Sequence, residues 1–273
     1  HITSYYTNLF GPPEESSLLV DENRTEDINQ VSTVENTYLV ESFTVDEVKQ
    51  TVFEMEHNKA PGPDGFPAEF YQVFWDVIKD DLMALFTDFY NGNLPLYRLN
   101  FGTIILLPKC HDATRIQQYR PICLLNVSFK IFTKVLTNRL TTIAKKVISP
   151  SQTAFLPGRN IMEGVVILHE TMHELKTKKQ KGILLKIDFE KAYDKVKWPF
   201  VMQTLRMKGF SDKWCQWMES VIKKGQVNIK INDQVGCNFE TKKGVRQGDP
   251  RSPILFNIVA DMLAILVNRA KNE

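Results

Sequence analysis

Residues 185–194 read Leu-Lys-Ile-Asp-Phe-Glu-Lys-Ala-Tyr-Asp, and the interpretation of the whole chain starts from them. They continue a short apolar run, 183–187, which predicts a buried β-strand. The strand would present the carboxylate of Asp188 at its end, where a crevice beside a sheet can hold Mg²⁺ through oxygen ligands. A single Asp after a strand is more often a helix cap or a loop residue, so Asp188 needs support from other motifs.

A second motif lies at residues 244–250, which read Gly-Val-Arg-Gln-Gly-Asp-Pro. Glycine lets a backbone approach a ligand closely, and the side-chain amide of Gln247 can both donate and accept hydrogen bonds. Upstream, Lys109 follows an apolar strand predicted at 103–107, and Arg120 lies in the loop segment after it. Both are cations suited to a triphosphate, and arginine is the better bidentate clamp.

The net charge of +2 conceals an uneven distribution along the chain. Residues 1–60 hold twelve acidic residues against three basic ones, whereas residues 109–160 carry a net charge of +8. Such a basic block favours a polyphosphate or nucleic-acid partner, and a solvated helix face is an equally weighted alternative. The candidate nucleic-acid contacts in this block and in the glycine-rich turn are Lys130, Lys134, Arg159 and Arg246.

Composition places the chain among ordinary globular proteins, because 43% of its 273 residues are hydrophobic and 11% are aromatic. The sequence has no secretory signal and no uncharged apolar run of the ~18 residues that a membrane span needs. We therefore predict an intracellular protein of the nucleus or cytoplasm, with no membrane partner. The cysteines lack zinc-site spacing and predict buried, reduced thiols at Cys110, Cys123, Cys215 and Cys237.

Helical patterns interleaved with few strands predict an α+β domain in which a small antiparallel sheet is backed by helices. A polar, acidic lead-in occupies residues 1–40. Thr44 and Glu47 form a capping box that starts the first clear helix, and alternation of apolar and polar residues predicts a hairpin at 226–240. Further helices are expected at 67–90, 127–147, 161–176 and from 252 onward.

The motifs, taken in order, resemble the reverse transcriptase of non-LTR (LINE-type) retrotransposons, plant elements in particular. The family implies a right-hand polymerase fold, with fingers at 41–180, a partial palm at 181–273 and no thumb. The resemblance covers roughly residues 40–273 and rests on six segments: NKAPGPDG at 58–65, LLPK at 106–109, YRPICLLN at 119–126, QTAFLPGR at 152–159, DFEKAYD at 188–194 and GVRQGDP at 244–250.

The resemblance implies a catalytic centre and its partners. Asp188 would be the catalytic metal ligand, helped by the backbone carbonyl of Phe189. The complete domain would hold two Mg²⁺ ions that stabilise the attacking and leaving oxygens of nucleotidyl transfer. An RNA template, a DNA primer and deoxynucleoside triphosphates would be the partners.

The resemblance also implies a nucleotide site around this centre. Tyr193 would be a steric gate whose ring collides with a ribose 2′-hydroxyl; a core tyrosine is the alternative. Gln247 and Gly248 would lie near the nucleotide and template. Lys109 and Arg120 would face the triphosphate.

Two features depart from the family. Arg251 stands where the family usually has Leu or Met. The family's second metal-binding carboxylates lie in an aromatic-x-Asp-Asp hairpin, which is missing here, and the pair Asp80-Asp81 lies in a helical stretch without that pattern. We therefore expect a fragment that does not polymerise alone. Its parent polyprotein would add the C-terminal palm and thumb, and an N-terminal endonuclease is a further candidate segment.

Two other functions stay open. The chain could be a relic that binds nucleic acid without catalysis. It could also be a zinc hydrolase, because His169, Glu170 and His173 match the pattern H-E-x-x-H in a predicted helix. No residue stands out as a third zinc ligand, so we favour two histidines on a partly exposed helix face.

Overall fold

The computed structural model describes residues 1–14 and 20–272. The α-helices within these ranges are α1 (Ile2–Leu9), α2 (Thr33–Leu39), α3 (Val45–Phe53), α4 (Ala68–Val73), α5 (Trp75–Tyr90), α6 (Val127–Val147), α7 (Ile161–Thr177), α8 (Ala192–Lys195), α9 (Trp198–Met207), α10 (Asp212–Ile222) and α11 (Ser252–Asn272). The strands are β1 (Phe101–Pro108), β2 (Tyr119–Leu125), β3 (Gln226–Ile231), β4 (Gln234–Val235) and β5 (Phe239–Glu240), and two short 3₁₀ turns lie at Leu96–Arg98 and Ile116–Gln118.

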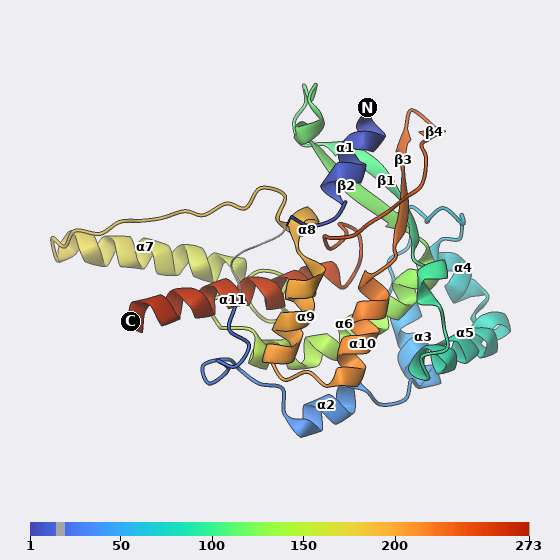
Figure 1. The fold of residues 1–273 in the computed structure, drawn as a ribbon, viewed down its shortest axis with the longest axis horizontal. Helices are drawn as coiled ribbons and strands as arrows, with labels where there is room; N and C mark the ends of the chain where they lie inside the picture. Colours follow the sequence, from blue (N-terminus) through green and yellow to red (C-terminus); the bar gives the residue numbers. More distant parts are fainter. Residues whose placement is uncertain (15–19, 273) are drawn as a thin grey trace.

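The small sheet is mixed, with the strand order β2-β1-β3-β4 and β5 also paired to β3. The α+β class is confirmed, but the antiparallel prediction is wrong for one pair. β1 and β3 run parallel, from Phe101 opposite Gln226 to Ile105 opposite Lys230. The physical reason is the connection between them, since a long helical crossover from α6 to α10 returns the chain to the same end of the sheet (Figure 1).

Helix α6 lies at the centre of the hydrophobic core. Its bounds match the predicted helix at 127–147, and Phe129, Phe132 and Leu136 are almost completely buried. The rings of Phe132 and Phe86 on α5 stack with centroids 4.1 Å apart. Because α6 is buried on most of its faces, it joins the sheet to the helices below it in Figure 1.

The acidic lead-in packs more closely than the sequence predicted. Tyr6, Ile28, Val31 and Leu39 are buried, although residues 15–19 lie outside the described part. Each of these side chains removes apolar surface from water, which favours folding by roughly 1.5–3 kcal/mol for a large side chain. Residues 1–14 and 20–40 therefore pack as part of the folded domain.

Acids of the N-terminal region pair with bases of α6. Arg139 is 4% exposed and binds Glu47 through two hydrogen bonds of 2.6 and 2.7 Å. The Glu47 carboxylate is therefore not free to complete the predicted capping box, of which only the bond from the Glu47 amide to the Thr44 hydroxyl forms. Lys146 likewise binds Glu35 at 2.6 Å. Part of the basic block thus balances acids of the same chain.

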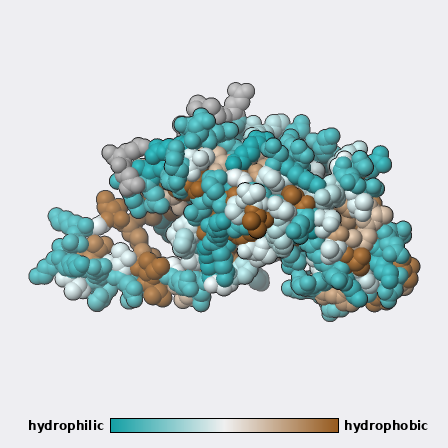
Figure 2. Space-filling model, turned by 90° about the horizontal axis from the view of Figure 1, so that it is seen from below, coloured by the Kyte–Doolittle hydropathy of each residue, from teal (hydrophilic) through white to brown (hydrophobic). Residues whose placement is uncertain are grey.

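The predicted strand at 183–187 does not form, and the prediction is wrong for this structure. Ile183 is 98% exposed, and residues 180–189 have no regular structure. A strand needs a neighbour that takes its backbone hydrogen bonds, and none lies beside this segment in residues 1–14 and 20–272. Helix α7 has no buried residue, and Figures 1 and 2 show it projecting from the body with apolar side chains uncovered.

Helix α11 is long and apolar enough by composition to cross a membrane. It packs instead on α6 and α9, and its residues Ile254, Ile258 and Met262 are buried. Helices of a protein core pass the same composition test. We therefore assign α11 to the core of the domain.

The cysteines are free and fall into two groups. Cys123 and Cys215 are buried, as predicted, and burial raises the pKa of each thiol to about 11. The prediction is wrong for Cys110 and Cys237, which lie in exposed segments that follow β1 and β4.

Candidate functional site

One pocket of about 580 Å³ gathers residues that are far apart in the chain. Lys109 and Arg120 reach it from the β1–β2 hairpin, Asp188 and Phe189 from the segment before α8, and Gln247 from the glycine-rich turn. These are five of the site residues predicted from the sequence. With Lys191, Glu190 and Asp194, three cations and three carboxylates line this cavity, an arrangement that can hold a phosphate group together with a cation.

Backbone hydrogen bonds hold the glycine-rich turn against the segment that follows Asp188. The amide of Gly244 donates to the Val196 carbonyl at 2.7 Å, and the amide of Val245 donates to the Tyr193 carbonyl at 2.8 Å. The indole of Trp198 donates to the Gly244 carbonyl at 2.8 Å. Gly244 has a φ of +85°, a conformation that L side chains rarely adopt, so glycine is required here.

The same turn also touches β2. The amide of Cys123 donates to the Gln247 carbonyl at 2.8 Å, and a Cβ on Gly248 would lie 2.6 Å from the Cys123 carbonyl oxygen. Gly248 does not line the pocket of Asp188. It lies instead with Lys130 and Lys134 around a neighbouring pocket of about 350 Å³, where burial lowers the pKa of Lys130.

Asp194 is a pocket residue that sequence reasoning did not select. It is 2% exposed, and its carboxylate accepts a hydrogen bond of 3.2 Å from the Gln247 amide. Burial raises its pKa to about 6, although Gln247, Lys191 and Lys109 each act to lower it. Asp194 ends the motif at 188–194, but no local sequence pattern indicates that it contacts Gln247.

Asp194 gives the unfolding free energy a pH dependence of known sign. Its pKa in the folded protein is raised, so the stability it contributes is present below the unfolded pKa of about 4 and lost as pH rises through about 6. As pH rises from about 4 to about 6, we expect the free energy of unfolding of Asp194→Asn to increase by about 1 to 3 kcal/mol relative to that of wild type. Urea unfolding in EDTA across this pH range measures the gain, and a difference that stays constant with pH would contradict it.

Tyr193 is not among the residues that line the pocket. Its ring stacks on Phe256 of α11 with centroids 4.6 Å apart and planes at 15°, and burial raises its pKa. Tyr193 is thus half-buried against the core, in line with the alternative considered for it, and its role as a steric gate stays a prediction.

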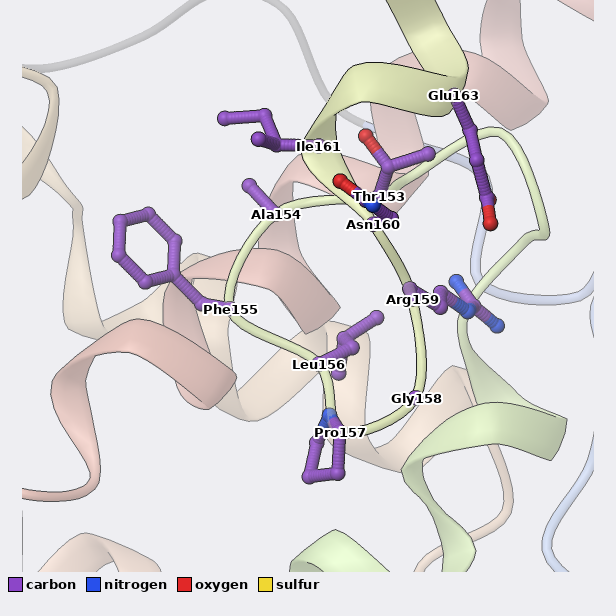
Figure 3. A pocket seen from close by; sticks show the side chains of 10 residues that line it. All are labelled: Thr153, Ala154, Phe155, Leu156, Pro157, Gly158, Arg159, Asn160, Ile161 and Glu163. Atoms are coloured by element: carbon purple, nitrogen blue, oxygen red, sulfur yellow. The ribbon is translucent and has the colours of Figure 1, made fainter.

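Arg159, predicted as a nucleic-acid contact, has a different role in the structure. Its guanidinium donates at 2.6 to 3.1 Å to four backbone carbonyls at and after the end of α6, those of Lys145, Ile148, Ser149 and Gln152. Figure 3 shows the side chain on the opposite side of its loop from Phe155. Because the last carbonyls of a helix lack partners within it, Arg159 acts as a cap, and its contact with nucleic acid stays a prediction.

Arg246, also predicted as a nucleic-acid contact, is buried with Arg251 and Asp249. The three residues are 7%, 3% and 3% exposed. Arg251 and Asp249 form an ion pair of 3.0 Å, and the terminal guanidinium nitrogens of Arg246 have no hydrogen-bond acceptor among the described residues. Burial lowers the pKa of Arg251 to about 10.

Replacing Arg251 by Leu is expected to lower the free energy of unfolding by about 3 to 5 kcal/mol, because removing one member of a buried ion pair leaves the Asp249 carboxylate buried without its cation. Urea unfolding measures the change. Arg206→Leu, at an exposed position of α9, is the control and should change stability by no more than about 0.5 kcal/mol. A loss in Arg251→Leu no larger than that of the control would contradict the prediction.

The described residues contain no group of three or more His, Cys, Asp or Glu side chains placed to hold a metal ion. Asp188 can supply one carboxylate and Phe189 lines the same pocket, but a second source of carboxylates is needed for two ions. His169 and His173 of the H-E-x-x-H pattern are exposed on α7 without a third ligand. The zinc alternative therefore has no site within the described ranges.

Comparison with known proteins gives a consistent result. Residues 107–272 match the family described as reverse transcriptase (RNA-dependent DNA polymerase). The transposon TX1 uncharacterized 149 kDa protein of Xenopus laevis is 31% identical over 97% of this chain. The Pol polyprotein from the type-2 retrotransposable element R2DM of Drosophila melanogaster is 27% identical over 76% of it. This chain spans only 20% and 19% of the lengths of these relatives.

Among solved structures, a chain of the partial Cas6-RT-Cas1–Cas2 complex aligns with 92% of this chain and 37% of its own length. The sequence identity is 16%, and the TM-score is 0.47.

Proposed function

Because the chain belongs to the reverse transcriptase (RNA-dependent DNA polymerase) family, we propose that it forms the fingers and most of the palm of a retrotransposon RNA-directed DNA polymerase. The parent enzyme would extend a DNA primer on an RNA template with deoxynucleoside triphosphates. One observation supports this most directly: the pocket of Asp188 also contains the two cations and the glutamine that such a nucleotide site needs.

Each pocket residue has a role in this proposal. Polymerases of this family use divalent metal ions, and we propose Mg²⁺ held by Asp188 and the Phe189 carbonyl. The ion would stabilise developing charge on the transferred phosphate. Lys109 and Arg120 would bind the triphosphate, arginine as the bidentate partner. Gln247 would contact the nucleotide or template, and Asp194 would fix the orientation of its amide.

The second metal-binding carboxylates would come from a further segment of the parent polyprotein. Three observations support this. No group of three or more His, Cys, Asp or Glu side chains placed to hold a metal ion lies within the described residues. The apolar run at 183–187 is exposed and has no partner strand there. The relatives are about five times longer than this chain. A strand added beside 183–187 would complete the sheet and bring its carboxylates near Asp188.

Primer extension tests the proposal. This chain and a version extended through the next segment of its reading frame are compared on poly-rA with an oligo-dT primer and Mg²⁺. We expect activity in the extended protein only, because one of two sources of metal ligands is missing from the shorter one. Inactivity of both proteins would favour the alternative, a domain that binds nucleic acid without catalysis.

A further inference from the structure

A second pocket of about 380 Å³ lies directly beside the candidate site and has no role in the function proposed above. The two pockets share Tyr5 and Leu9 of α1 and also Lys191. Helix α1 therefore forms a wall common to both, and a ligand in one pocket can extend into the other.

Lysines dominate the lining of this second pocket. Lys191, Lys195 and Lys197 follow Asp188 in the chain, and Lys243 precedes the glycine-rich turn. The hydrogen bond from the Gly244 amide to the Val196 carbonyl holds these two segments together. The lysines thus converge through the same backbone contacts that build the candidate site.

The partners of these lysines are mostly neutral. Lys197 donates to the Glu14 carbonyl at 2.6 Å, and Lys243 donates to the Pro12 carbonyl at 3.4 Å. Lys191 donates to the Tyr5 hydroxyl. Within residues 1–14 and 20–272, only Lys195 of the four has a carboxylate as hydrogen-bond partner, that of Glu190 at 2.7 Å. A phosphate oxygen is a stronger acceptor for an ammonium group than a carbonyl or hydroxyl.

The described residues therefore leave positive charge in this pocket. Four lysines line it, and the nearby acids of the described ranges are Glu14, in the lining, Glu190, paired at its edge, and Asp194, whose pKa Lys191 acts to lower. An anion can enter without displacing a buried carboxylate, because Lys195 and Glu190 are both exposed.

We propose that this lysine pocket binds backbone phosphates of a nucleic-acid strand that continues from the candidate site. The inference rests on the proposed function only in taking the strand to continue from the candidate site. A nucleotide's own triphosphate would be held by Lys109 and Arg120, so a second cationic pocket beside it fits the neighbouring phosphates of a strand. Tyr5, which lies in both linings, offers a ring on which a base can stack.

The test compares two triple variants of this chain with equal charge change. Lys195→Gln/Lys197→Gln/Lys243→Gln neutralises the pocket, and Lys176→Gln/Lys178→Gln/Lys181→Gln neutralises exposed lysines on and after α7. Anisotropy of fluorescein-labelled oligo(rA) gives affinity against salt concentration. In a plot of the logarithm of the binding constant against the logarithm of the salt concentration, each lost phosphate contact with a single strand lowers the magnitude of the slope by about 0.7. We therefore expect a decrease of about 2 for the pocket variant alone. Equal slopes and affinities in both variants would overturn the proposal.

A charge-preserving variant and a competitor complete the design. Lys195→Arg/Lys197→Arg/Lys243→Arg should retain binding, which separates loss of charge from misfolding. Competition by dTTP or pyrophosphate distinguishes the two sources of phosphate. If either displaces the oligonucleotide in wild type but not in the pocket variant, the pocket takes free nucleotide phosphates and the strand proposal fails.

These experiments test the lysine pocket and the proposed polymerase function separately. The oligonucleotide assay needs no polymerisation, so an inactive extended protein would contradict the proposed function and leave the lysine pocket intact. In an active extended protein, the pocket variant should raise the KM for primer–template more than it lowers kcat. An unchanged KM would count against the pocket.

Discussion

Replacing Asp188 by Asn in the extended protein is expected to reduce primer extension by more than about 10²-fold. Substituting a residue that only hydrogen-bonds to a metal ligand already lowers metal affinity or activity by about 10- to 100-fold. Asp188 is itself a predicted ligand, and the only predicted carboxylate ligand in the described pocket. Its loss should therefore exceed that range. Single-turnover extension at saturating Mg²⁺ is the measurement, and removal of metal by EDTA should abolish the activity of the wild-type protein.

Glu190→Gln is the matched control for Asp188→Asn. Glu190 lines the same pocket two residues further on, is exposed like Asp188, and loses the same charge on substitution. Its carboxylate already has a partner, since Lys195 lowers its pKa through a hydrogen bond. We expect its activity to stay within about tenfold of wild type, the lower limit for residues that orient a ligand. Equal losses in both variants would mean that the pocket responds to net charge and that Asp188 is not a specific ligand.

The parts of the structure that sequence reasoning predicted are those that local patterns determine. The apolar stripe of α6 gave its bounds at 127–147, and alternation around Asn232 predicted the turn between β3 and β4. The five pocket residues were found because each lies in a short motif whose residue types fit phosphate and metal chemistry. Their roles stay predictions until the activity measurements are made.

The parts that sequence reasoning missed depend on contacts between distant segments. Nothing near residues 183–187 shows that their strand lacks a neighbour, and strand pairing is a property of two segments. The parallel pairing of β1 and β3 depends on the path of the intervening helices. Lys208 and Arg139 look like surface cations in a helical pattern, yet they are 0% and 4% exposed because their partners arrive from other elements.

Replacing Lys208 by Ala is expected to lower the free energy of unfolding by about 3 to 5 kcal/mol, the usual cost of removing one member of a buried ion pair. The ammonium group donates to Asp261 of α11 at 2.7 Å and to the Val147 carbonyl of α6 at 2.6 Å. Asp261 also accepts from the Ser149 amide at 2.9 Å. The pair thus joins three helix segments, and urea unfolding followed by tryptophan fluorescence measures its loss.

Two further variants separate the ion pair from simple loss of a lysine. Lys223→Ala breaks an exposed pair with Glu219 and should cost no more than about 0.5 kcal/mol. Lys208→Met/Asp261→Leu removes both buried charges and leaves only the Ser149 amide and the Val147 carbonyl without their partners, so it should cost less than Lys208→Ala alone. If the double variant instead lost the sum of the two single losses, the charges would be uncoupled. Because whole domains are stable by only about 5 to 15 kcal/mol, this one contact supplies a large share of the stability of the packing between α6, α9 and α11.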